Sequence, residues 1–435
     1  MLASEFKRRR RELMRVMGPD SIAILATAPL LIRNRDVHYP YRPDSDFYYL
    51  TGFPEPEAVL VLIPGRKHAE YILFNRERDP IKEQWDGSRA GQEGACIEYD
   101  ADDSFPIGDL DDILPRMLEQ CERIFYVMDC NPQFDKRFLE WLNAIRCESR
   151  NGMQGPVEII ALDHYLHEMR LYKSCPELKV MRQAARISAK AHKKVMQACK
   201  AGMWEYQLEA EFVRECSHQG AKAQAYPPIV GAGANGCTLH YIDNMDKVED
   251  QQMLLIDAGC EWDFYASDIT RTYPVNGLFS IPQRQLYELV LAAQEAAIAK
   301  VKPGNHWNDP HDVAVRTITR GLIKLGILKG SLPKLIREKK YKTFFPHRTG
   351  HWIGMDVHDV GDYKVDGTWR LFEPGMALTI EPGLYIPAGI RSIAKKWWNI
   401  GIRVEDDVVV TKDGCEVLTK DIAKSVAEIE SIMAA

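Results

Sequence analysis

The stretch of sequence that decides the fold is LLIDAGCEWDFYASDITRTYPV, residues 254–275. Its apolar, β-branched and aromatic residues predict two strands, Met253–Cys260 and Tyr265–Val275, because such residues favour extended backbone. A turn near Trp262 and Asp263 would join the two strands into a hairpin. Acidic residues interrupt both of these otherwise apolar strands, and they point to the chemistry of the chain.

Two of these acids, Asp257 and Asp268, differ in number by eleven. Residues that face each other across a two-residue hairpin turn differ by an odd number and share a face. The predicted turn therefore places the two carboxylates opposite each other, where like charges repel strongly unless a cation lies between them. An acidic hairpin alone is weak evidence for a metal, because a buried acid can also belong to a salt bridge.

Three further segments place an ionisable residue inside or at the end of an apolar, β-like run: PHRTGHWIGMDVHDVG (346–361), LTIEPGLY (378–385) and IRVEDDVVV (402–410). A carboxylate buried there is costly unless it is paired or binds a metal. Glu381 and Glu405 thus repeat the pattern, and acids combined with an imidazole suit divalent ions. Two ions about 3.5–4 Å apart need bridging carboxylates, so four acids and one histidine suffice for a dinuclear site.

Each segment also has a purely structural interpretation. His347 and His351 are four residues apart and could share a helix face, although Gly350 and Gly354 favour a loop or strand. His358 could be a hydrogen-bonded core histidine, and a Glu-Pro-Gly sequence after a strand is often only a turn. The four segments together, in this order, are much more specific than any one of them.

The rest of the chain predicts two domains with a boundary near 170–175. The second part alternates helices and strands, with helices over 176–200, 205–219, 283–301 and 309–326, and further strands over Met376–Glu381 and Gly401–Thr411. The first third is mixed α/β, with strands over Ser21–Ala28, Ala58–Ile63, Tyr71–Phe74, Ile124–Met128 and Val157–Leu162, and helices over Ile113–Cys121 and Asp135–Ile145.

Composition restricts the class of protein. The 435 residues carry a net charge of −6, and 46% are apolar and 27% charged, which excludes a disordered chain, a fibrous repeat and a disulfide mini-protein. The mild acidity argues against a nucleic-acid partner. The longest apolar run, Ala58–Pro64, is far shorter than the ~20 residues of a membrane span. Ten cysteines without a CxxC pair, and no apolar stretch after the basic N-terminus, predict reduced thiols and a cytoplasmic location.

Four consecutive arginines, Arg8–Arg11, stand near the N-terminus. They could form a patch for nucleic acid or lipid. The preferred interpretation is a solvated face of a first helix that turns Phe6, Leu13 and Met14 inward.

With these segments in order, the chain resembles the pita-bread metallopeptidases and, within them, the Xaa-Pro aminopeptidases (aminopeptidase P). The resemblance runs essentially end to end. It rests on HYPYRPDSDFYYLTGFPEPEAVLVL (38–62), LFNRERD (73–79), QWDG (84–87), NGCTLHY (235–241), IDAGCEWDFYASDITRTYPVNG (256–277), GHWIGMDVHDVG (350–361), EPGMALTIEPGLYIP (373–387) and IGIRVEDDVVVT (400–411). It implies an α/β N-terminal domain over 1–172 and an α+β pita-bread catalytic domain over 173–435.

The resemblance implies a dinuclear metal centre with five ligands, Asp257, Asp268, His351, Glu381 and Glu405. Asp268 and Glu405 would bridge the two divalent ions. Mn²⁺ is the first expectation for these ions, and Zn²⁺, Co²⁺ and Mg²⁺ are the alternatives.

Residues around the metals take roles from the same resemblance. A hydroxide that bridges the metals would attack the peptide, and Glu381 would pass its proton to the leaving proline nitrogen. His240 and His358 would donate hydrogen bonds to the oxyanion. The remaining substrate contacts would be Tyr226 and Leu239 at the N-terminal residue, Val357 and Tyr385 at the proline ring, with His347, Arg403 and Trp85 nearby.

Trp85 would reach the site from an N-terminal domain, commonly that of a neighbouring subunit. Alternatively, it could be a core residue of its own domain. Two stretches depart from the family pattern: Arg348-Thr349 replaces smaller, more apolar residues, and Ala388–Asn399 does not align. Both departures concern substrate preference rather than the metal cage.

The expected protein is a cytoplasmic homodimer or homotetramer that hydrolyses the bond between any N-terminal residue and a penultimate proline. Its partners would be peptide substrates, with no nucleic acid and no membrane. A prolidase, which cleaves only Xaa-Pro dipeptides, is the alternative with the same fold and cage. A metal-free pita-bread protein that binds peptides is a remote alternative, because such proteins lack the ligands.

Overall fold

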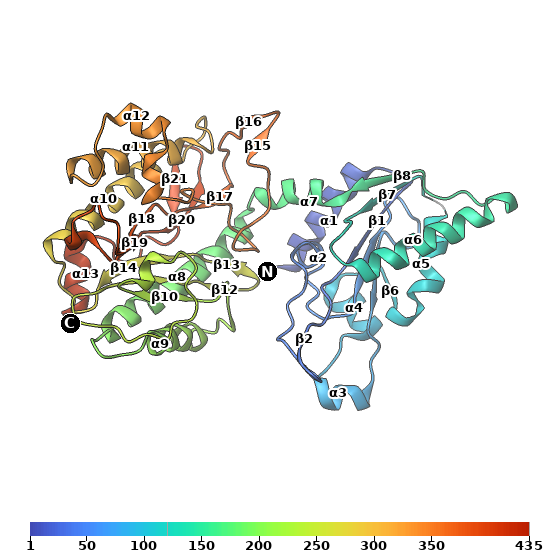
Figure 1. Cartoon of the computed structure of the whole chain (residues 1–435). Coiled ribbons are helices and arrows are strands. Elements are labelled where there is room, and N and C mark those ends of the chain that lie inside the picture. Colours follow the sequence, from blue (N-terminus) through green and yellow to red (C-terminus); the bar gives the residue numbers. More distant parts are fainter. Residues whose placement is uncertain (120, 435) are drawn as a thin grey trace. The chain divides into compact units, whose positions relative to one another are not determined.

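The computed structural model describes residues 1–119 and 121–434, and the chain divides into two compact units, Met1–Met169 and Arg170–Ala435 (Figure 1). Each unit has its own hydrophobic core, as expected for domains of these lengths. The predicted fold classes, α/β for the first unit and α+β for the second, are confirmed by the elements described below.

A six-stranded mixed sheet forms the centre of the first unit. Its strands, in chain order, are β1 (Ser21–Ala26), β4 (Val59–Leu62), β5 (Tyr71–Asn75), β6 (Asp103–Pro106), β7 (Arg123–Tyr126) and β8 (Glu158–Ala161). They are arranged as β6-β5-β4-β1-β7-β8, with β4 antiparallel to both of its neighbours and the other pairs parallel. One core joins apolar side chains of these strands, except those of β8, to α5 (Leu110–Leu118) and α6 (Pro132–Cys147).

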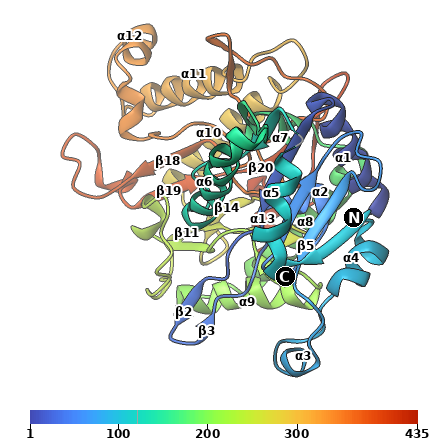
Figure 2. The same cartoon turned by 90° about the vertical axis from the view of Figure 1, so that its right-hand side faces the viewer.

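The other elements of the first unit are α1 (Ala3–Met17), α2 (Ser45–Thr51), α3 (Pro80–Asp86), α4 (Gly91–Tyr99) and the hairpin β2 (Ile32–Asn34) and β3 (Val37–His38). The helix α7 (Leu162–Leu171) contains the boundary between the two units. The hairpin and α3 extend away from the sheet (Figure 2). Asp79 caps α3 by accepting hydrogen bonds from two backbone N–H groups of its first turn. Every residue of α3 is at least partly exposed, so this helix contributes little to the core of its unit.

The expectation that Arg8–Arg11 forms a solvated face is wrong for two of the four residues. Arg9 and Arg10 are buried. Arg9 Nη1 donates to the carbonyl of Tyr49 at 3.0 Å, and Arg10 Nη1 donates to the carbonyl of Leu50 at 3.0 Å. These carbonyls belong to the last turn of α2, which lacks partners within its own helix. The two arginines therefore donate hydrogen bonds to the carbonyl groups at the end of a helix forty residues away. A charge pattern within a short stretch of sequence cannot predict such distant partners.

In the second unit, α8 packs beside α9 and α10 packs beside α11. The helices are α8 (Cys175–Ala198), α9 (Glu205–His218), α10 (Ile281–Ile298), α11 (Asp309–Lys324), α12 (Leu332–Arg337) and α13 (Val426–Met433). The first four agree with the predicted ranges to within about three residues. A capping box between Ser174 and Glu177, followed by Pro176 in the first turn, explains the sharp start of α8.

Small antiparallel sheets lie against these helices, in the orders β10-β11-β14, β13-β12-β9, β17-β20-β21, β18-β19 and β15-β16. The strands are β9 (Ala223–Gln224), β10 (Ile229–Ala232), β11 (Met253–Asp257), β12 (Cys260–Trp262), β13 (Tyr265–Ala266), β14 (Thr270–Pro274), β15 (Lys364–Val365), β16 (Thr368–Trp369), β17 (Ala377–Ile380), β18 (Gly383–Ile386), β19 (Ile400–Arg403), β20 (Asp406–Val410) and β21 (Cys415–Val417).

The two predicted strands of the acidic hairpin are each broken in two, β11 from β12 and β13 from β14. At the break, Gly259 lies so close to the other strand that a Cβ on it would stand 1.7 Å from the carbonyl oxygen of Ser267. Only glycine permits this approach. This close approach of Gly259 to Ser267 separates the sheet that carries Asp257 from the smaller sheet around the hairpin turn.

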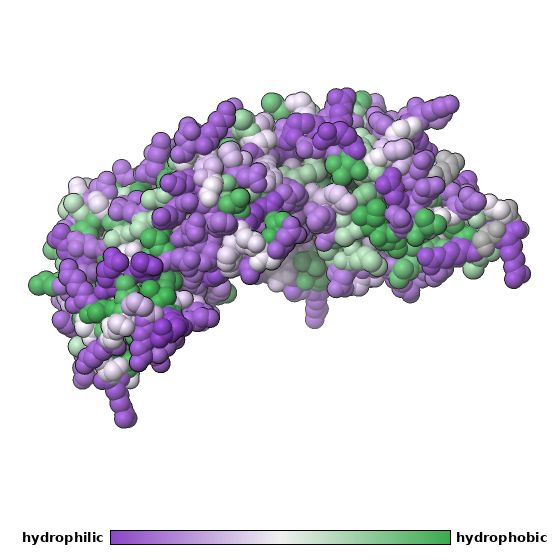
Figure 3. Space-filling view, turned by 90° about the horizontal axis from the view of Figure 1, so that it is seen from above, coloured by the Kyte–Doolittle hydropathy of each residue, from purple (hydrophilic) through white to green (hydrophobic). Residues whose placement is uncertain are grey.

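The hydrophilic surface and the free thiols agree with what the composition predicts. Most of the face shown in Figure 3 is hydrophilic, with apolar residues in scattered patches. All ten cysteines are free thiols. Across the part of the chain that the structure describes, helices are too short or too polar to span a bilayer.

Candidate active site

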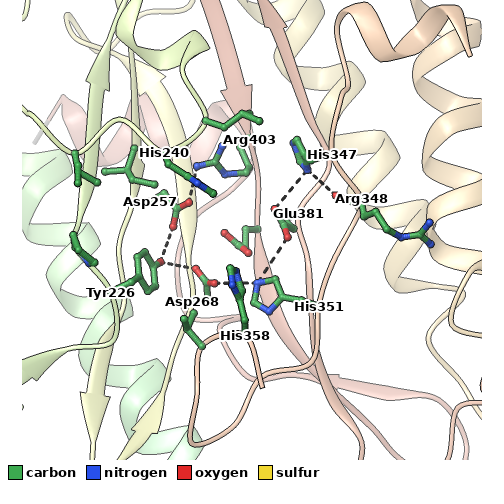
Figure 4. Close-up of a pocket in the computed structure, with 16 residues that line it drawn as sticks. Tyr226, His240, Asp257, Asp268, His347, Arg348, His351, His358, Glu381 and Arg403 are labelled. Carbon is green, nitrogen blue, oxygen red and sulfur yellow. Dashed lines mark hydrogen bonds and ion pairs between the residues drawn. The ribbon is translucent and has the colours of Figure 1, made fainter. Parts of the chain in front are cut away.

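A cavity of about 460 Å³ opens in the second unit and collects nearly all the residues that the sequence predicts (Figure 4). The five predicted metal ligands line it: Asp257, Asp268, His351, Glu381 and Glu405. Seven other predicted residues line it as well: Tyr226, Leu239, His240, His347, Val357, His358 and Arg403. Tyr385 lies directly behind this lining, in contact with Ile229 and Leu255.

The acidic hairpin has a different register from the predicted one. Asp257 is paired with Thr270, not with Asp268. The turn is formed by Asp263 and Phe264, whose φ angles of 49° and 63° are those of a primed hairpin turn. This turn is centred one residue later than expected, which moves every pairing by two positions. The direct opposition of the two aspartates is therefore wrong, although their shared face is kept because the shift is even.

Tyr226 connects the two aspartates across the pocket. Its hydroxyl oxygen lies 2.6 Å from Asp257 Oδ1 and 2.5 Å from Asp268 Oδ1. The sequence assigned Tyr226 to the substrate, but in the structure its hydroxyl contacts both acids. Burial, followed by the charges of these two acids, raises the pKa of Tyr226 well above its usual value, so the phenol keeps its proton.

His351 reaches the acids from a loop, as the glycines on either side of it predict. This loop is held on β17, where Thr379 exchanges hydrogen bonds with the backbone of His351. A Cβ on Gly350 would stand 2.0 Å from the carbonyl oxygen of Thr379, so this close approach also requires glycine. The His351 Nδ1 atom contacts the carbonyl of Trp352 at 2.9 Å, which leaves Nε2 free to bind a metal.

Three of the ligand atoms already lie close enough for one ion. Asp268, His351 and Glu405 each offer an atom within 4.8 Å of the others. His351 Nε2 is 3.4 Å from Asp268 Oδ2 and 3.8 Å from Glu381 Oε1. Asp257 stands next to Asp268 through Tyr226, so all five predicted ligands surround the same space. Carboxylate oxygens and a neutral imidazole nitrogen are the donors that divalent ions bind.

The charges of the pocket also fit cations. Burial, and then the neighbouring acids, raise the pKa of Glu405 well above its usual value. Burial raises the pKa of Asp257 as well, and it raises that of Glu381 to about 7. Buried acids this close to each other resist ionisation unless positive charge is supplied. The donor set therefore fits divalent metal ions.

Arg403 supplies one fixed positive charge at the wall of the cage. Its Nη2 atom lies 2.5 Å from Asp257 Oδ2, and its Nε donates to Thr270 Oγ1 at 3.1 Å. Thr270 in turn donates to Glu405 Oε2 at 2.6 Å. Sequence reasoning missed Thr270. Its position two residues after Asp268, on the same face of the hairpin, is the signal that could have identified it.

Arg403 also begins a chain of hydrogen bonds along one side of the pocket. Its Nη1 atom donates to the Tyr385 hydroxyl at 2.8 Å, and this oxygen lies 2.9 Å from His347 Nε2. His347 Nδ1 is 2.6 Å from the carbonyl of Arg348, so Nε2 accepts the tyrosine proton. Burial, and then the charge of Arg403, lower the pKa of His347 to about 3. His347 is therefore neutral, and it forms a rigid wall with Tyr385.

His240 and His358 face the cavity from segments without regular structure (Figure 4). The rings of His358 and His351 meet edge to face, with centroids 4.4 Å apart. Burial, and then the neighbouring His351, lower the pKa of His358, which favours the neutral ring. Arg348, which departs from the family pattern, also lines the cavity, but its side chain extends away from the acids.

Trp85 lies on α3 of the first unit and is 84% exposed. The interpretation of Trp85 as a core residue of its own domain is therefore wrong. An indole this exposed is unusual, because aromatic side chains gain most when they are covered.

The whole chain resembles known proteins. It matches Metallopeptidase family M24 over residues 179–412 and the aminopeptidase P N-terminal domain over residues 6–126. It is 43% identical to the Xaa-Pro aminopeptidase of Escherichia coli (strain K12), which covers 99% of this chain and 98% of that protein. It is 35% identical to the Xaa-Pro aminopeptidase 3 of Homo sapiens, which covers 98% of this chain and 85% of that protein.

Solved structures agree. The aminopeptidase PepP of Pseudomonas aeruginosa superposes with a TM-score of 0.99 at 58% identity, covering 100% of this chain and 98% of that one. The zinc-substituted aminopeptidase P of E. coli, in complex with product, superposes with a TM-score of 0.97 at 42% identity, covering 100% and 98%. The chain therefore belongs to metallopeptidase family M24 and, within it, to the Xaa-Pro aminopeptidases.

Proposed function

We propose that this metallo-aminopeptidase removes the N-terminal residue from peptides whose second residue is proline, with two divalent ions in the cage. The observation that carries the proposal is the convergence of five carboxylate and imidazole ligands in one buried pocket. The relatives named Xaa-Pro aminopeptidase support it over nearly the full chain, and they do not favour a prolidase. The five ligands likewise argue against a metal-free peptide-binding protein.

We assign the ions to Asp257, Asp268, His351, Glu381 and Glu405, with Asp268 and Glu405 shared between them. Asp268 is central among these residues, because it stands beside both Asp257 and His351. We expect Mn²⁺, since a carboxylate-rich set with one imidazole suits it, and Zn²⁺, Co²⁺ and Mg²⁺ are alternatives. When bound, two such ions would polarise the scissile carbonyl and bring the pKa of the attacking water close to neutrality.

The residues around the cage would then handle the proton and the developing charge. Glu381 lines the cavity with its Oε1 atom 3.8 Å from His351 Nε2, where a carboxylate could take a proton from the attacking water and return it. We assign it the transfer to the leaving proline nitrogen. His240 and His358 would donate hydrogen bonds to the oxyanion, because both face the cavity beside the acids.

The preference for proline would come from the rigid side of the pocket. Tyr385 and His347 are locked together and to Arg403, so they cannot adapt to a flexible side chain. We assign them, with Val357, to the pyrrolidine ring, and Tyr226 and Leu239 to the N-terminal residue. A pocket that does not require an N–H at the scissile nitrogen accepts the tertiary amide of an Xaa–Pro bond, which has none.

We also propose that the protein is a homodimer or homotetramer in the cytoplasm, with residues 1–172 and 173–435 as its two domains. The exposed apolar side chains of the first unit support an interface between copies, because large apolar surfaces on a lone chain are unfavourable. Those on the β2–β3 hairpin and on α3 are Leu31, Ile32, Val37, Tyr39, Ile81 and Trp85. The ten free thiols and the net charge of −6 support the cytoplasm and argue against nucleic acid.

Turnover of a peptide panel tests the function directly. The metal-free protein would be prepared with a chelator, reloaded with each metal, and given Xaa-Pro dipeptides, Xaa-Pro-Yaa tripeptides and Xaa-Ala-Yaa controls. Cleavage of the Xaa–Pro bond in tripeptides and longer peptides, restored best by Mn²⁺, is the expected result. Cleavage of dipeptides alone would establish a prolidase, and turnover that survives the chelator would remove the metal from the proposal.

A further inference from the structure

Leu239 and His240 reach the cavity from an irregular segment of backbone, residues 238–246. The described backbone over 238–246 forms neither helix nor strand, and His240 is exposed. No ladder of backbone hydrogen bonds fixes this segment, and yet a residue that stabilises a transition state must be held to within a fraction of an ångström. Most of its anchors are therefore side chains, beside a backbone bond at its end from the N–H of Glu205 to the carbonyl of Asp246 at 2.9 Å.

The main anchor is Glu205, the first residue of α9, which is completely buried. Its Oε1 atom accepts hydrogen bonds from the backbone N–H of Ala232 at 2.8 Å and from Asn235 Nδ2 at 3.0 Å. Its Oε2 atom accepts from the Tyr241 hydroxyl at 2.8 Å and from the backbone N–H of Asp246 at 3.0 Å. A carboxylate accepts about four hydrogen bonds, so this one is fully used by donors of the chain.

These four donors lie on both sides of His240. Ala232 and Asn235 precede it, and Tyr241 and Asp246 follow it, so one carboxylate fixes both ends of the segment. Tyr241 is the next residue after His240, and its bond to Glu205 therefore fixes the backbone nearest to the imidazole ring. A second anchor, Asn244, accepts from the backbone N–H of Val230 at 3.0 Å, but it stands four residues beyond His240.

We propose that Glu205 is a positioning residue for the reaction, and that it acts through Tyr241 to hold His240 over the oxyanion site. The inference rests on the proposed function, because it gives His240 the oxyanion role. Burial of a charged group with four donors costs desolvation that an apolar residue would avoid. We therefore infer that Glu205 is buried here because it holds the segment 238–246 in one conformation.

Two conservative variants test the proposal. Glu205→Gln keeps the shape but replaces one acceptor oxygen with an NH₂ group, which then faces two donors. Tyr241→Phe removes one hydroxyl. Each should lower kcat/KM for Xaa-Pro-Yaa peptides by about tenfold, through kcat, because a small displacement of a group acting in the transition state is costly. Tyr287→Phe is the matched control, since it removes a buried hydroxyl that donates to the carbonyl of Lys424 at 2.8 Å, away from the pocket.

Combination with His240→Ala separates positioning from a general loss of stability. If Glu205 acts through His240, then Glu205→Gln should cost no more than about twofold in a protein that already lacks this histidine. Equal costs with and without His240, or a Tyr241→Phe variant as active as Tyr287→Phe, would overturn the proposal.

A readout independent of activity distinguishes this failure from failure of the proposed function. The imidazole C–H resonance of His240, assigned from its absence in His240→Ala, should shift or broaden in Glu205→Gln and Tyr241→Phe but not in Tyr287→Phe. An unchanged resonance in all variants would overturn positioning even in an active enzyme. A wild-type chain that leaves the peptide panel uncleaved would instead overturn the oxyanion role of His240, and with it this proposal.

Discussion

The acids of the cage and the histidines beside them are held in different ways. Asp257 ends β11, Glu381 follows β17, and Glu405 stands between β19 and β20, so paired backbone places these three carboxylates. Asp268 lies in the short connection between β13 and β14. His240 and His358 stand on segments without such pairing. The positions of these acids are therefore set mainly by strand register. The positions of the two histidines depend on individual side chains that anchor their loops.

The loop of His358 has a buried carboxylate of its own. Asp359 lies 2.8 Å from Lys173 Nζ and 2.5 Å from Arg170 Nη2, and all three side chains are at least 97% buried. These ion pairs lower the pKa of Asp359 despite the opposing effect of burial. Glu205 and Asp359 are thus comparable, because each is a buried acid that anchors the segment of one of the two histidines. Metal binding and rate enhancement should therefore be separable by mutation.

The largest effect is expected from the two acids that we propose as bridging ligands. Asp268→Ala or Glu405→Ala should abolish both activity and metal binding, because each change removes a donor from two ions at once. The Tm should fall as well, since the remaining like-charged acids lose their counter-charge. Metal content by atomic emission and turnover at micromolar metal would be measured together, and near-normal turnover in either variant would contradict the dinuclear assignment.

Removal of His358 should affect the rate alone. His358→Ala should keep two ions per chain but lower kcat by roughly 10²–10³-fold, the loss that follows removal of one oxyanion donor. Metal titration by calorimetry and steady-state kinetics on the same preparation would check this. Loss of an ion from the variant would mean that His358 is a ligand, and the contrast between strands and loops would then break down.

Trp85 tests whether the site is complete in one chain. Trp85→Ala should stay folded and oligomeric while kcat/KM for tripeptides falls by roughly tenfold, which corresponds to about 1.4 kcal/mol of transition-state stabilisation. An indole supplied by a neighbouring copy would exclude water from the cleft, and its effect should differ between short and long peptides. Sedimentation that finds an active wild-type monomer would remove this role, as would unchanged kinetics in the variant.

The smallest effect concerns stability and pH. Burial lowers the pKa of His192, behind the acidic hairpin, from 6.5 to about 4. Above pH 6.5 the His192 ring is neutral in both the folded and the unfolded chain. Between pH 6.5 and 4 only the unfolded chain takes up the proton. The free energy of unfolding therefore decreases as the pH is lowered, by up to ~3 kcal/mol. His192→Leu should lose less stability than the wild type between pH 7 and 4.5 in metal-free urea titrations. Parallel curves would show that His192 does not contribute.

The helices and the acids could be predicted from the sequence because both depend on short-range patterns. Apolar residues at helical spacing located α8 to α11, and acids inside apolar runs identified Asp257, Asp268, Glu381 and Glu405. The hairpin register could not be predicted, because it depends on which two residues adopt positive φ at the turn. The burial of Arg9 and the four hydrogen bonds of Glu205 also escaped prediction, since their partners are distant in the chain.

The separation of cage and loops can be tested most directly by counting the metal ions that remain bound when both histidines are removed. The variant carrying His240→Ala and His358→Ala would be loaded with Mn²⁺, desalted, and measured for metal per chain beside the wild type. Two ions per chain, with an unchanged Tm and kcat reduced by at least 10²-fold, is the result that strand-held acids predict. A loss of one or both ions would show that the histidines bind the metals, and that metal binding does not depend on the acids and His351 alone.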